Sequence, residues 1–313
     1  MKGVTVISSL QFKLIELSDR DWMEECFRAG HRGSLEYSFT NLFVWRKVLN
    51  IQAARFGGYA VVMANSNNPT YVFPMGTGPL LPVIEAMQED ARERGVPLRF
   101  NTLLEEDRLR LEALFPGRFE ITPIRHAYDY VYESQKLIGL SGKKLSPKRN
   151  NINKFVKEYR DWQFETIDGS NIDEVHQMAH RWRELSAAAG GSTESLDDEI
   201  CALEETFRHY FELRMDGGFI RAGGRIIAFS IGDPLNDDVY LVQFEKAFQE
   251  IPGAYQIINQ QFAEHFAANY KFVNREDDTG DEGLRRAKLS YDPIYLVAKY
   301  TAQEIEPAQE SEA

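Results

Sequence analysis

The stretch FIRAGGRIIAFSIGDPLNDDVYLVQF, residues 219–244, decides the fold of this chain. Two apolar runs, residues 219–222 and 225–231, are joined by Gly223-Gly224. Paired glycines between apolar runs are typical of a tight turn with positive φ, so these runs predict an antiparallel hairpin. Residues 239–244 are rich in β-branched and aromatic side chains, which predicts a third strand.

The segments that follow predict a helix, a short strand and a second helix. Pro252-Gly253 interrupts the chain, and from Ala254 to Tyr270 apolar residues recur at helical spacing. Residues 271–274 predict a strand, and a basic helix follows at residues 284–289. This order resembles the core of GNAT-type acyltransferases, in which a cleft opens between the third strand and the next.

The glycine before the first of these helices has two interpretations. Free N–H groups at a helix N-terminus bind anions, so Gly253 and Ala254 are candidates for contacting the phosphates of coenzyme A or the end of an aminoacyl-tRNA. The alternative is an ordinary turn, which Pro-Gly forms more often.

The first half of the chain repeats the same order of elements. It predicts a hairpin around Gly57-Gly58, a strand at residues 71–74, a helix at 80–94, a strand at 98–101 and a helix at 105–115. Because order and spacing correspond between the halves, we infer a duplication. The alternating residues 119–132 are expected to complete the first sheet.

The predicted fold class is therefore α/β (α+β), with two tandem GNAT-like domains, each a mixed, mostly antiparallel sheet flanked by helices. We expect an N-terminal, supporting domain at residues 1–133 and a C-terminal domain with the active cleft at 134–301. The tail at residues 302–313, rich in Glu, Gln, Ala and Pro, is expected to be disordered.

Composition limits the classes of function. With 313 residues and 43% hydrophobic content, the chain can bury a full core. Its formal net charge of −12 argues against indiscriminate binding to nucleic acid or anionic membranes. Because no apolar run reaches about 20 residues and no signal peptide is evident, we expect a cytoplasmic protein.

The cysteines and histidines of the sequence do not predict a metal site. Cys26 and Cys201 lie far apart and are expected to be reduced, structural thiols. His176 and His180 have the spacing of helix-borne zinc ligands, but the sequence places no carboxylate or cysteine to complete the set. We therefore expect no metal and no tightly bound cofactor.

The segment between the predicted domains is strongly basic. Residues 136–160 contain eight basic residues and one acidic residue, a net charge of +7, which leaves the rest of the chain near −19. Ser146-Pro147 predicts a helix start, so Lys148, Arg149 and Lys154 would lie on successive turns. Such a helix is either a phosphate-binding patch for aminoacyl-tRNA or a solvated face.

Several motifs together resemble a known family. They are EYSFTNLFVW at residues 36–45, GKK to KRNNINKF at 142–155, GAYQ to Asn259, and NREDD to GLRRAKLSYDP at 274–293. The chain is similar over nearly its whole length to bacterial proteins related to the phosphatidylglycerol lysyltransferase C-terminal domain. That resemblance implies tandem GNAT-like domains related to Fem peptidyl transferases, which move an aminoacyl group from aminoacyl-tRNA to an amine or hydroxyl.

The resemblance also defines candidate partners and site residues. The membrane-spanning region of the lysyltransferase is missing, so the expected acceptor is a small molecule, a peptide or a lipid headgroup. The candidate acid or base residues are Glu245, Glu276, Asp277 and Tyr291. The candidates for binding donor or substrate are Lys148, Arg149, Asn153, Lys154, Gly253, Ala254, Asn259, Asn274, Arg275, Arg285 and Lys288.

Two other functions stay open from the sequence. An acetyltransferase would use acetyl-CoA and bind its pyrophosphate at Gly253. A protein without catalysis would use the duplicated fold to bind an aminoacylated or phosphorylated ligand. The acidic run at residues 276–278 can also be a solvated loop. Likewise, Asn153, Asn259 and Asn274 can simply cap helices or turns.

Overall fold

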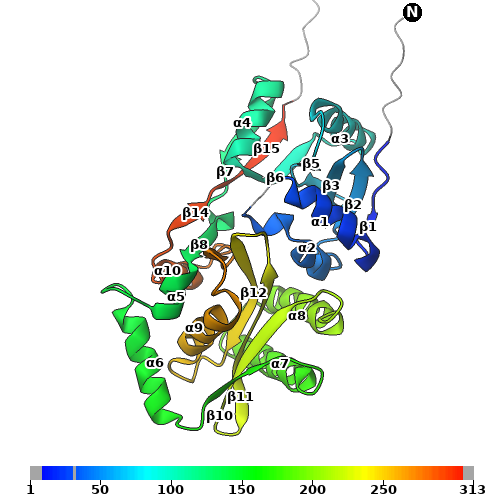
Figure 1. The fold of residues 1–313 in the computed structure, drawn as a ribbon. Coiled ribbons are helices and arrows are strands. Elements are labelled where there is room, and N and C mark those ends of the chain that lie inside the picture. Colours follow the sequence, from blue (N-terminus) through cyan, green and yellow to red (C-terminus); the bar gives the residue numbers. More distant parts are fainter. Residues whose placement is uncertain (1–8, 31–32, 306–313) are drawn as a thin grey trace, which may run out of the picture. The chain divides into compact units, whose positions relative to one another are not determined.

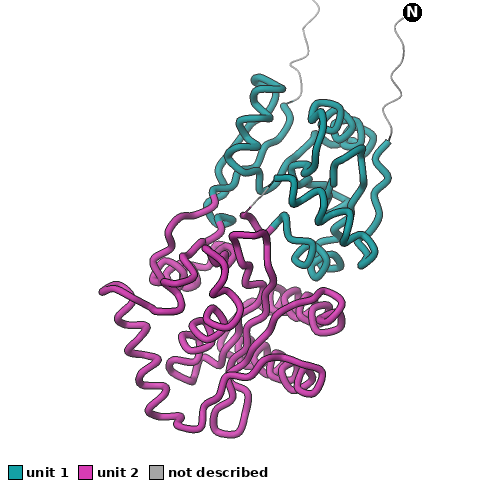
Figure 2. Tube along the Cα trace, in the orientation of Figure 1, with its two compact units in different colours: residues 1–32, 36–128, 298–313 teal, residues 33–35, 129–297 magenta. Residues whose placement is uncertain are grey.

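A computed structural model describes residues 9–30 and 33–305 of the chain, and Figure 1 shows its elements. The chain forms two compact units, coloured separately in Figure 2. Unit 1 comprises residues 1–32, 36–128 and 298–313, and unit 2 comprises residues 33–35 and 129–297.

Unit 1 is built on a sheet of eight strands. Seven strands follow the order β1-β2-β3-β4-β6-β15-β7, and β5 pairs with β3. The strands are β1 (Lys13–Leu14), β2 (Gln52–Phe56), β3 (Tyr59–Ala64), β4 (Thr70–Tyr71), β5 (Met75–Gly76), β6 (Arg99–Leu104), β7 (Phe119–Pro123) and β15 (Lys299–Glu304). The helices are α1 (Arg20–Arg28), α2 (Phe39–Trp45), α3 (Leu81–Glu93) and α4 (Glu105–Leu114).

Unit 2 is built on a sheet of seven strands in the order β14-β8-β13-β12-β11-β10-β9. The strands are β8 (Asp129–Glu133), β9 (Gln163–Thr166), β10 (Asp216–Ala222), β11 (Arg225–Pro234), β12 (Val239–Ala247), β13 (Phe272–Asn274) and β14 (Tyr295–Val297). The helices are α5 (Ser134–Gly139), α6 (Ser146–Glu158), α7 (Ile172–Ala188), α8 (Thr193–Arg208), α9 (Ala254–Phe266) and α10 (Glu282–Leu289).

The two faces of the second sheet are covered by different helices (Figure 1). Successive residues of a strand point to opposite faces. On β12, Glu245 contacts Asn259 of α9, whereas the adjacent Lys246 contacts Glu199 of α8. Helices α7 and α8 therefore cover one face, and α9 covers the other.

Strands β12 and β13 separate after a short parallel pairing. Only residues 239–241 of β12 pair with residues 272–274 of β13, while β12 continues to Ala247 against β11. The backbone of β13 ends at Asn274, so the side chains of Glu245 and Arg275 follow the point of separation. This is the place where the sequence predicted a site.

The predicted fold class is confirmed: both units are mixed, mostly antiparallel sheets flanked by helices. The hairpin of β10 and β11, the third strand β12, and helices α9 and α6 lie where the sequence predicted them. The hairpin of β2 and β3 is likewise present in unit 1.

Two strand assignments differ from the prediction. Residues 119–132 were expected to complete the first sheet, but only β7 belongs to it; β8 pairs with β13 and β14 in the second sheet. Residues 302–304 were assigned to a disordered tail, but they belong to β15, which pairs between β6 and β7. Residues 306–313 of the predicted tail lie outside the described residues.

Among the residues that the structure describes, no helix combines the length and apolar character needed to cross a membrane.

Candidate functional site

The candidate site begins with a buried ion pair at the separation of β12 and β13. Arg275 Nη2 lies 2.8 Å from Glu245 Oε1, and both side chains are nearly buried, with 12% and 10% exposed. Asn259, on α9, donates a hydrogen bond from Nδ2 to the other carboxylate oxygen of Glu245, at 3.0 Å. A strand, a turn and a helix thus converge on one carboxylate.

Two buried polar atoms of this cluster have no hydrogen-bond partner among the described residues. They are Arg275 Nη1, which is a donor, and Asn259 Oδ1, which is an acceptor. A buried polar group without a partner costs about 1–3 kcal/mol, so such atoms are uncommon in folded proteins. Both atoms belong to side chains that contact the carboxylate of Glu245, which makes this cluster the candidate site.

Aromatic rings line the same cluster. The guanidinium of Arg275 lies 4.9 Å from the ring centre of Tyr291 and 5.7 Å from that of Tyr132, a strand residue of β8. Burial raises the pKa of both phenols, against the opposing effect of the Arg275 charge. Both hydroxyls therefore stay protonated at neutral pH and can donate hydrogen bonds.

Lys148 approaches the cluster from α6. Its Nζ lies 4.4 Å from the ring centre of Tyr291, a distance typical of a cation–π contact. Partial burial and the nearby charge of Arg275 lower the pKa of Lys148. Lys148 thus brings an amine from α6 to the edge of the cluster.

The turn after β13 is held by Lys288 of α10. Lys288 Nζ donates to the backbone carbonyl of Arg275, at 2.6 Å, and to that of Asp277. Burial lowers the pKa of Lys288 to about 8. Tyr132 extends this arrangement, because its hydroxyl donates to the carbonyl of Lys288 at 2.8 Å. Lys288 therefore positions Arg275 through the backbone.

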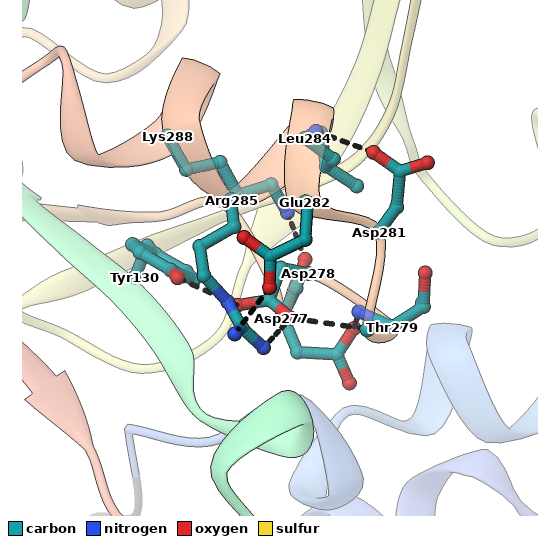
Figure 3. Close-up of polar contacts among 10 residues, drawn as sticks. Tyr130, Asp277, Asp278, Thr279, Asp281, Glu282, Leu284, Arg285 and Lys288 are labelled. Atoms are coloured by element: carbon teal, nitrogen blue, oxygen red, sulfur yellow. Dashed lines mark hydrogen bonds and ion pairs between the residues drawn. The ribbon is translucent and has the colours of Figure 1, made fainter.

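A second ion pair closes the same turn, as Figure 3 shows. Asp278 is fully buried and accepts from Arg285 Nε and Nη2, both at 2.9 Å, and from the hydroxyl of Tyr130 at 2.6 Å. Burial alone would raise the pKa of Asp278, but Arg285 and Tyr130 outweigh it and hold that pKa below its usual value. The guanidinium of Arg285, a candidate for donor binding, is thus engaged with Asp278.

The other predicted residues of this segment support the turn. Asn274 is fully buried; its amide donates to Asp129 Oδ2 at 3.0 Å and to the carbonyl of Gly33 at 2.8 Å, and its oxygen accepts from Glu276 N. Asp277 Oδ1 accepts from Thr279 N at 3.1 Å. Asn274 thus holds the backbone of this turn.

Gly253 and Ala254, the candidates for anion binding, have packing roles. Gly253 has a φ of +92°, and a Cβ there would lie 2.8 Å from the carbonyl oxygen of Asn151 in α6. Ala254 is fully buried and its N–H donates to Ile251 O at 3.2 Å. The glycine is therefore required for the close approach of α6 and α9, as well as for its left-handed backbone.

The basic segment is only partly available to a ligand. Lys136 and Lys144 both pair with Asp292, at 2.7 and 2.8 Å. Arg149 donates to the carbonyl of Gly142 at 2.9 Å and to that of Leu140. Asn153 and Lys154 are exposed on α6. The guanidinium of Arg149, a candidate for donor binding, thus holds the loop before α6.

Sequence reasoning missed two features of unit 2. Tyr132 was assigned to the first sheet, although the alternating pattern of residues 119–132 did mark it as a strand residue. Glu204, on α8, supplies the carboxylate that the sequence did not place beside His176 and His180, and lies 2.9 Å from each ring. That expectation of an incomplete ligand set was therefore wrong, because it considered one helix alone.

Residues 27–303 match the family described as phosphatidylglycerol lysyltransferase, C-terminal. The chain belongs to this family. Membership supports acyl transfer in general, and it confirms the resemblance noted in the sequence. The matched residues include the cluster between β12 and β13.

The chain is also similar to solved structures and to a known sequence. A conserved protein of unknown function from Bacteroides thetaiotaomicron is 34% identical, with a TM-score of 0.89 over 95% of this chain and 100% of that chain. The C-terminal domain of a putative lysylphosphatidylglycerol synthetase from Agrobacterium fabrum is 13% identical, with a TM-score of 0.65 over 93% of both chains, a likeness of fold. An uncharacterized protein of Mycoplasmoides gallisepticum is 24% identical over 186 residues, which span 56% of each protein.

Proposed function

We propose that this protein transfers an aminoacyl group from aminoacyl-tRNA to an amine or hydroxyl acceptor. The observation that carries the proposal is the pair of unpartnered buried atoms, Arg275 Nη1 and Asn259 Oδ1, at the separation of β12 and β13. One is a donor and the other an acceptor, and Glu245 holds both side chains in place.

An aminoacyl ester matches this pair in chemical type. Its α-ammonium group is a donor and suits Asn259 Oδ1, whereas its ester carbonyl is an acceptor and suits Arg275 Nη1. An acetyl group has the carbonyl but no ammonium, so it leaves the oxygen of Asn259 without a partner. This difference favours the aminoacyl group over acetyl-CoA.

The same residues suit the chemistry of transfer. The acceptor nitrogen or oxygen forms a bond to the carbonyl carbon, the C–O bond to the tRNA ribose breaks, and the acceptor's proton ends on the ribose oxygen. Arg275 Nη1 and the Tyr291 hydroxyl donate to the developing oxyanion. Lys148, with its lowered pKa, takes the proton from the acceptor and returns it to the leaving oxygen.

A test compares two asparagine variants in acceptor-dependent deacylation of aminoacyl-tRNA. Asn259→Ala removes the acceptor for the α-ammonium, and the loss of one hydrogen bond to a charged group is worth about 1.5–3 kcal/mol, or roughly 10- to 150-fold in kcat/KM. Asn67→Ala changes an exposed asparagine in the turn between β3 and β4 and is the matched control, with unchanged kcat/KM expected. Equal activity of Asn259→Ala and the wild type would contradict the proposal.

The donor is tested separately by thermal unfolding. Only a ligand that binds the folded state raises the unfolding midpoint. We expect a rise with aminoacyl-tRNA, a smaller rise with deacylated tRNA, and no saturable rise with acetyl-CoA or CoA. A saturable rise with acetyl-CoA would favour an acetyltransferase instead. Binding of aminoacyl-tRNA without turnover with any acceptor would favour a binding protein.

A further inference from the structure

A cluster of potential metal ligands lies on the opposite face of the second sheet from Arg275. His176 and His180 are one turn apart on α7, and Glu204 faces them from α8. His176 Nε2 and His180 Nε2 each lie 2.9 Å from Glu204 Oε1, and the two nitrogens are 3.1 Å apart. Three potential ligand atoms thus form a nearly equilateral triangle.

The triangle has close to the dimensions of one face of a tetrahedral zinc site. Zinc binds imidazole nitrogen and carboxylate oxygen at about 2.0–2.2 Å, which makes the edges of a regular tetrahedron about 3.3–3.6 Å. An ion about 2.05 Å from all three atoms would lie about 1.1 Å above the plane of this triangle. For regular tetrahedral edges the ligand atoms would separate by a few tenths of an ångström, and the ion would lie about 0.7 Å above their plane. Small side-chain rotations suffice for that adjustment.

The surroundings of the triangle hold the ligands in place. The ring of His176 lies 4.8 Å from that of Phe207 on α8, which restricts its orientation. Farther along the same two helices, Arg183 Nε lies 3.0 Å from Asp197 Oδ1, so the helices are joined at a second point. Because a metal site requires ligands with fixed directions, this support matters as much as the ligand types.

The cluster is also accessible from solution. The side chains of His176, His180 and Glu204 are 31%, 48% and 34% exposed, so an ion can enter and a water can take the fourth position. Two imidazoles and one carboxylate are a ligand set that zinc uses when it keeps one open position.

We propose that His176, His180 and Glu204 form a zinc-binding site that joins α7 to α8. The proposal does not depend on the proposed transferase activity, since Lys246 and Glu245 place the two clusters on opposite faces of the sheet. Bound zinc replaces the direct contacts between the three side chains and stabilises the helix pair. Its proximal effect is on stability, and zinc takes no part in the transfer step.

The test uses the full chain after treatment with EDTA and desalting. Zinc is titrated in competition with a chromophoric chelator, and Co²⁺ is added in a parallel experiment as a spectroscopic probe. We expect one zinc per chain, removed again by EDTA, and the intense visible absorption of tetrahedral Co²⁺. Zinc should also raise the unfolding midpoint.

Single substitutions locate the site. His180→Gln and Glu204→Gln change partly exposed side chains, so both variants should fold, and each should lower zinc affinity at least tenfold. His265→Gln, which changes an exposed histidine on α9, is the control and should bind zinc as the wild type does. Equal zinc affinity in the wild type and His180→Gln, or the weak absorption of octahedral Co²⁺, would overturn the proposal.

Discussion

The two units carry the same strand arrangement with different chemistry at the point where their parallel strands separate. In unit 1, Tyr71 of β4 pairs with Phe100 of β6, and Phe73 packs on Phe100 with ring centres 5.5 Å apart. In unit 2, β12 and β13 pair in the same parallel sense, and the residues that follow are Glu245 and Arg275. Packed phenyl rings lie beside the parallel pairing in unit 1, whereas a buried ion pair lies beyond it in unit 2.

This difference is consistent with the expected supporting role of unit 1 and the expected active cleft of unit 2. Phe73 and Phe100 are within the apolar core of unit 1. The pair in unit 2 costs desolvation energy, and a hydrophobic pair would be about as stable or more so. The prediction that unit 2 holds the site and that unit 1 supports its own fold would account for a costly pair at this place in unit 2.

The largest expected effect is on the stability of unit 1. Phe100→Ala should lower the free energy of unfolding by about 3–5 kcal/mol, because it removes a fully buried ring and leaves a cavity. Denaturant unfolding measures the loss. Phe211→Ala, at a ring that is 56% exposed, is the control and should stay within about 0.5 kcal/mol.

The same variant tests the division between the units. If unit 1 only supports its own fold, kcat/KM per folded molecule should be unchanged in Phe100→Ala. A loss of transfer activity in the folded fraction would show that unit 1 contributes to the site. The proposed division of roles between the two units would then be wrong.

A smaller effect is expected at the satisfied ion pair of unit 2. Asp278→Ala leaves Arg285 and Tyr130 without their buried acceptor, which should cost about 2–3 kcal/mol. Because the folded-state pKa of Asp278 lies below the unfolded value of about 3.9, its stabilisation is complete above that pH and is lost as pH falls. The difference in unfolding free energy between wild type and variant should therefore shrink below about pH 4.

Asp281→Ala is the control for this prediction. Asp281 caps α10 by accepting from Leu284 N at 2.6 Å, so its loss should cost about 1 kcal/mol. A similar cost for the two variants would mean that Asp278 is no more than a second capping residue.

The next smaller effect is a pH dependence of stability that arises from the buried amine of Lys288. Its folded-state pKa of about 8 lies below the unfolded value of about 10.4, so the unfolded chain binds more protons between these values. Stability therefore rises with pH, by about 1 kcal/mol between pH 7 and pH 9. Urea unfolding at both pH values should show this rise in the wild type and not in Lys288→Met.

Lys144→Met is the matched variant here, since the Lys144 side chain is 77% exposed. It should keep the rise in stability. If Lys288→Met keeps it too, the amine of Lys288 is not the titrating group.

The sequence predicted best those features that depend on local pattern. Gly223-Gly224, the helical spacing after Ala254 and the Ser146-Pro147 start each depend on a few neighbouring residues, and each element is present. Among the candidate residues, Glu245, Asn259, Arg275, Tyr291 and Lys148 do meet in one cluster.

What the sequence could not predict depends on distant partners. An alternating strand is compatible with either sheet, so nothing local assigns β8 to β13 or β15 to β6. From the sequence, Arg285 and Arg149 have no evident acceptor. The structure shows that Arg285 donates to Asp278 and that Arg149 donates to the carbonyl of Gly142. Glu204 is 28 residues from His176 and meets it only because α7 and α8 pack together.

The smallest expected effect concerns the exposed positive charge on α6, a helix of unit 2. Lys154 is exposed on α6 of unit 2, whereas the Lys144 ammonium already pairs with Asp292. If α6 contacts tRNA phosphates, Lys154→Gln should reduce the slope of log Kd against log salt by about 0.7–0.9, the value of one released counterion. Lys144→Gln and Arg92→Gln, an exposed arginine of unit 1, should change it little. An equal change in all three variants would mean that net charge, and not the α6 face, attracts the tRNA.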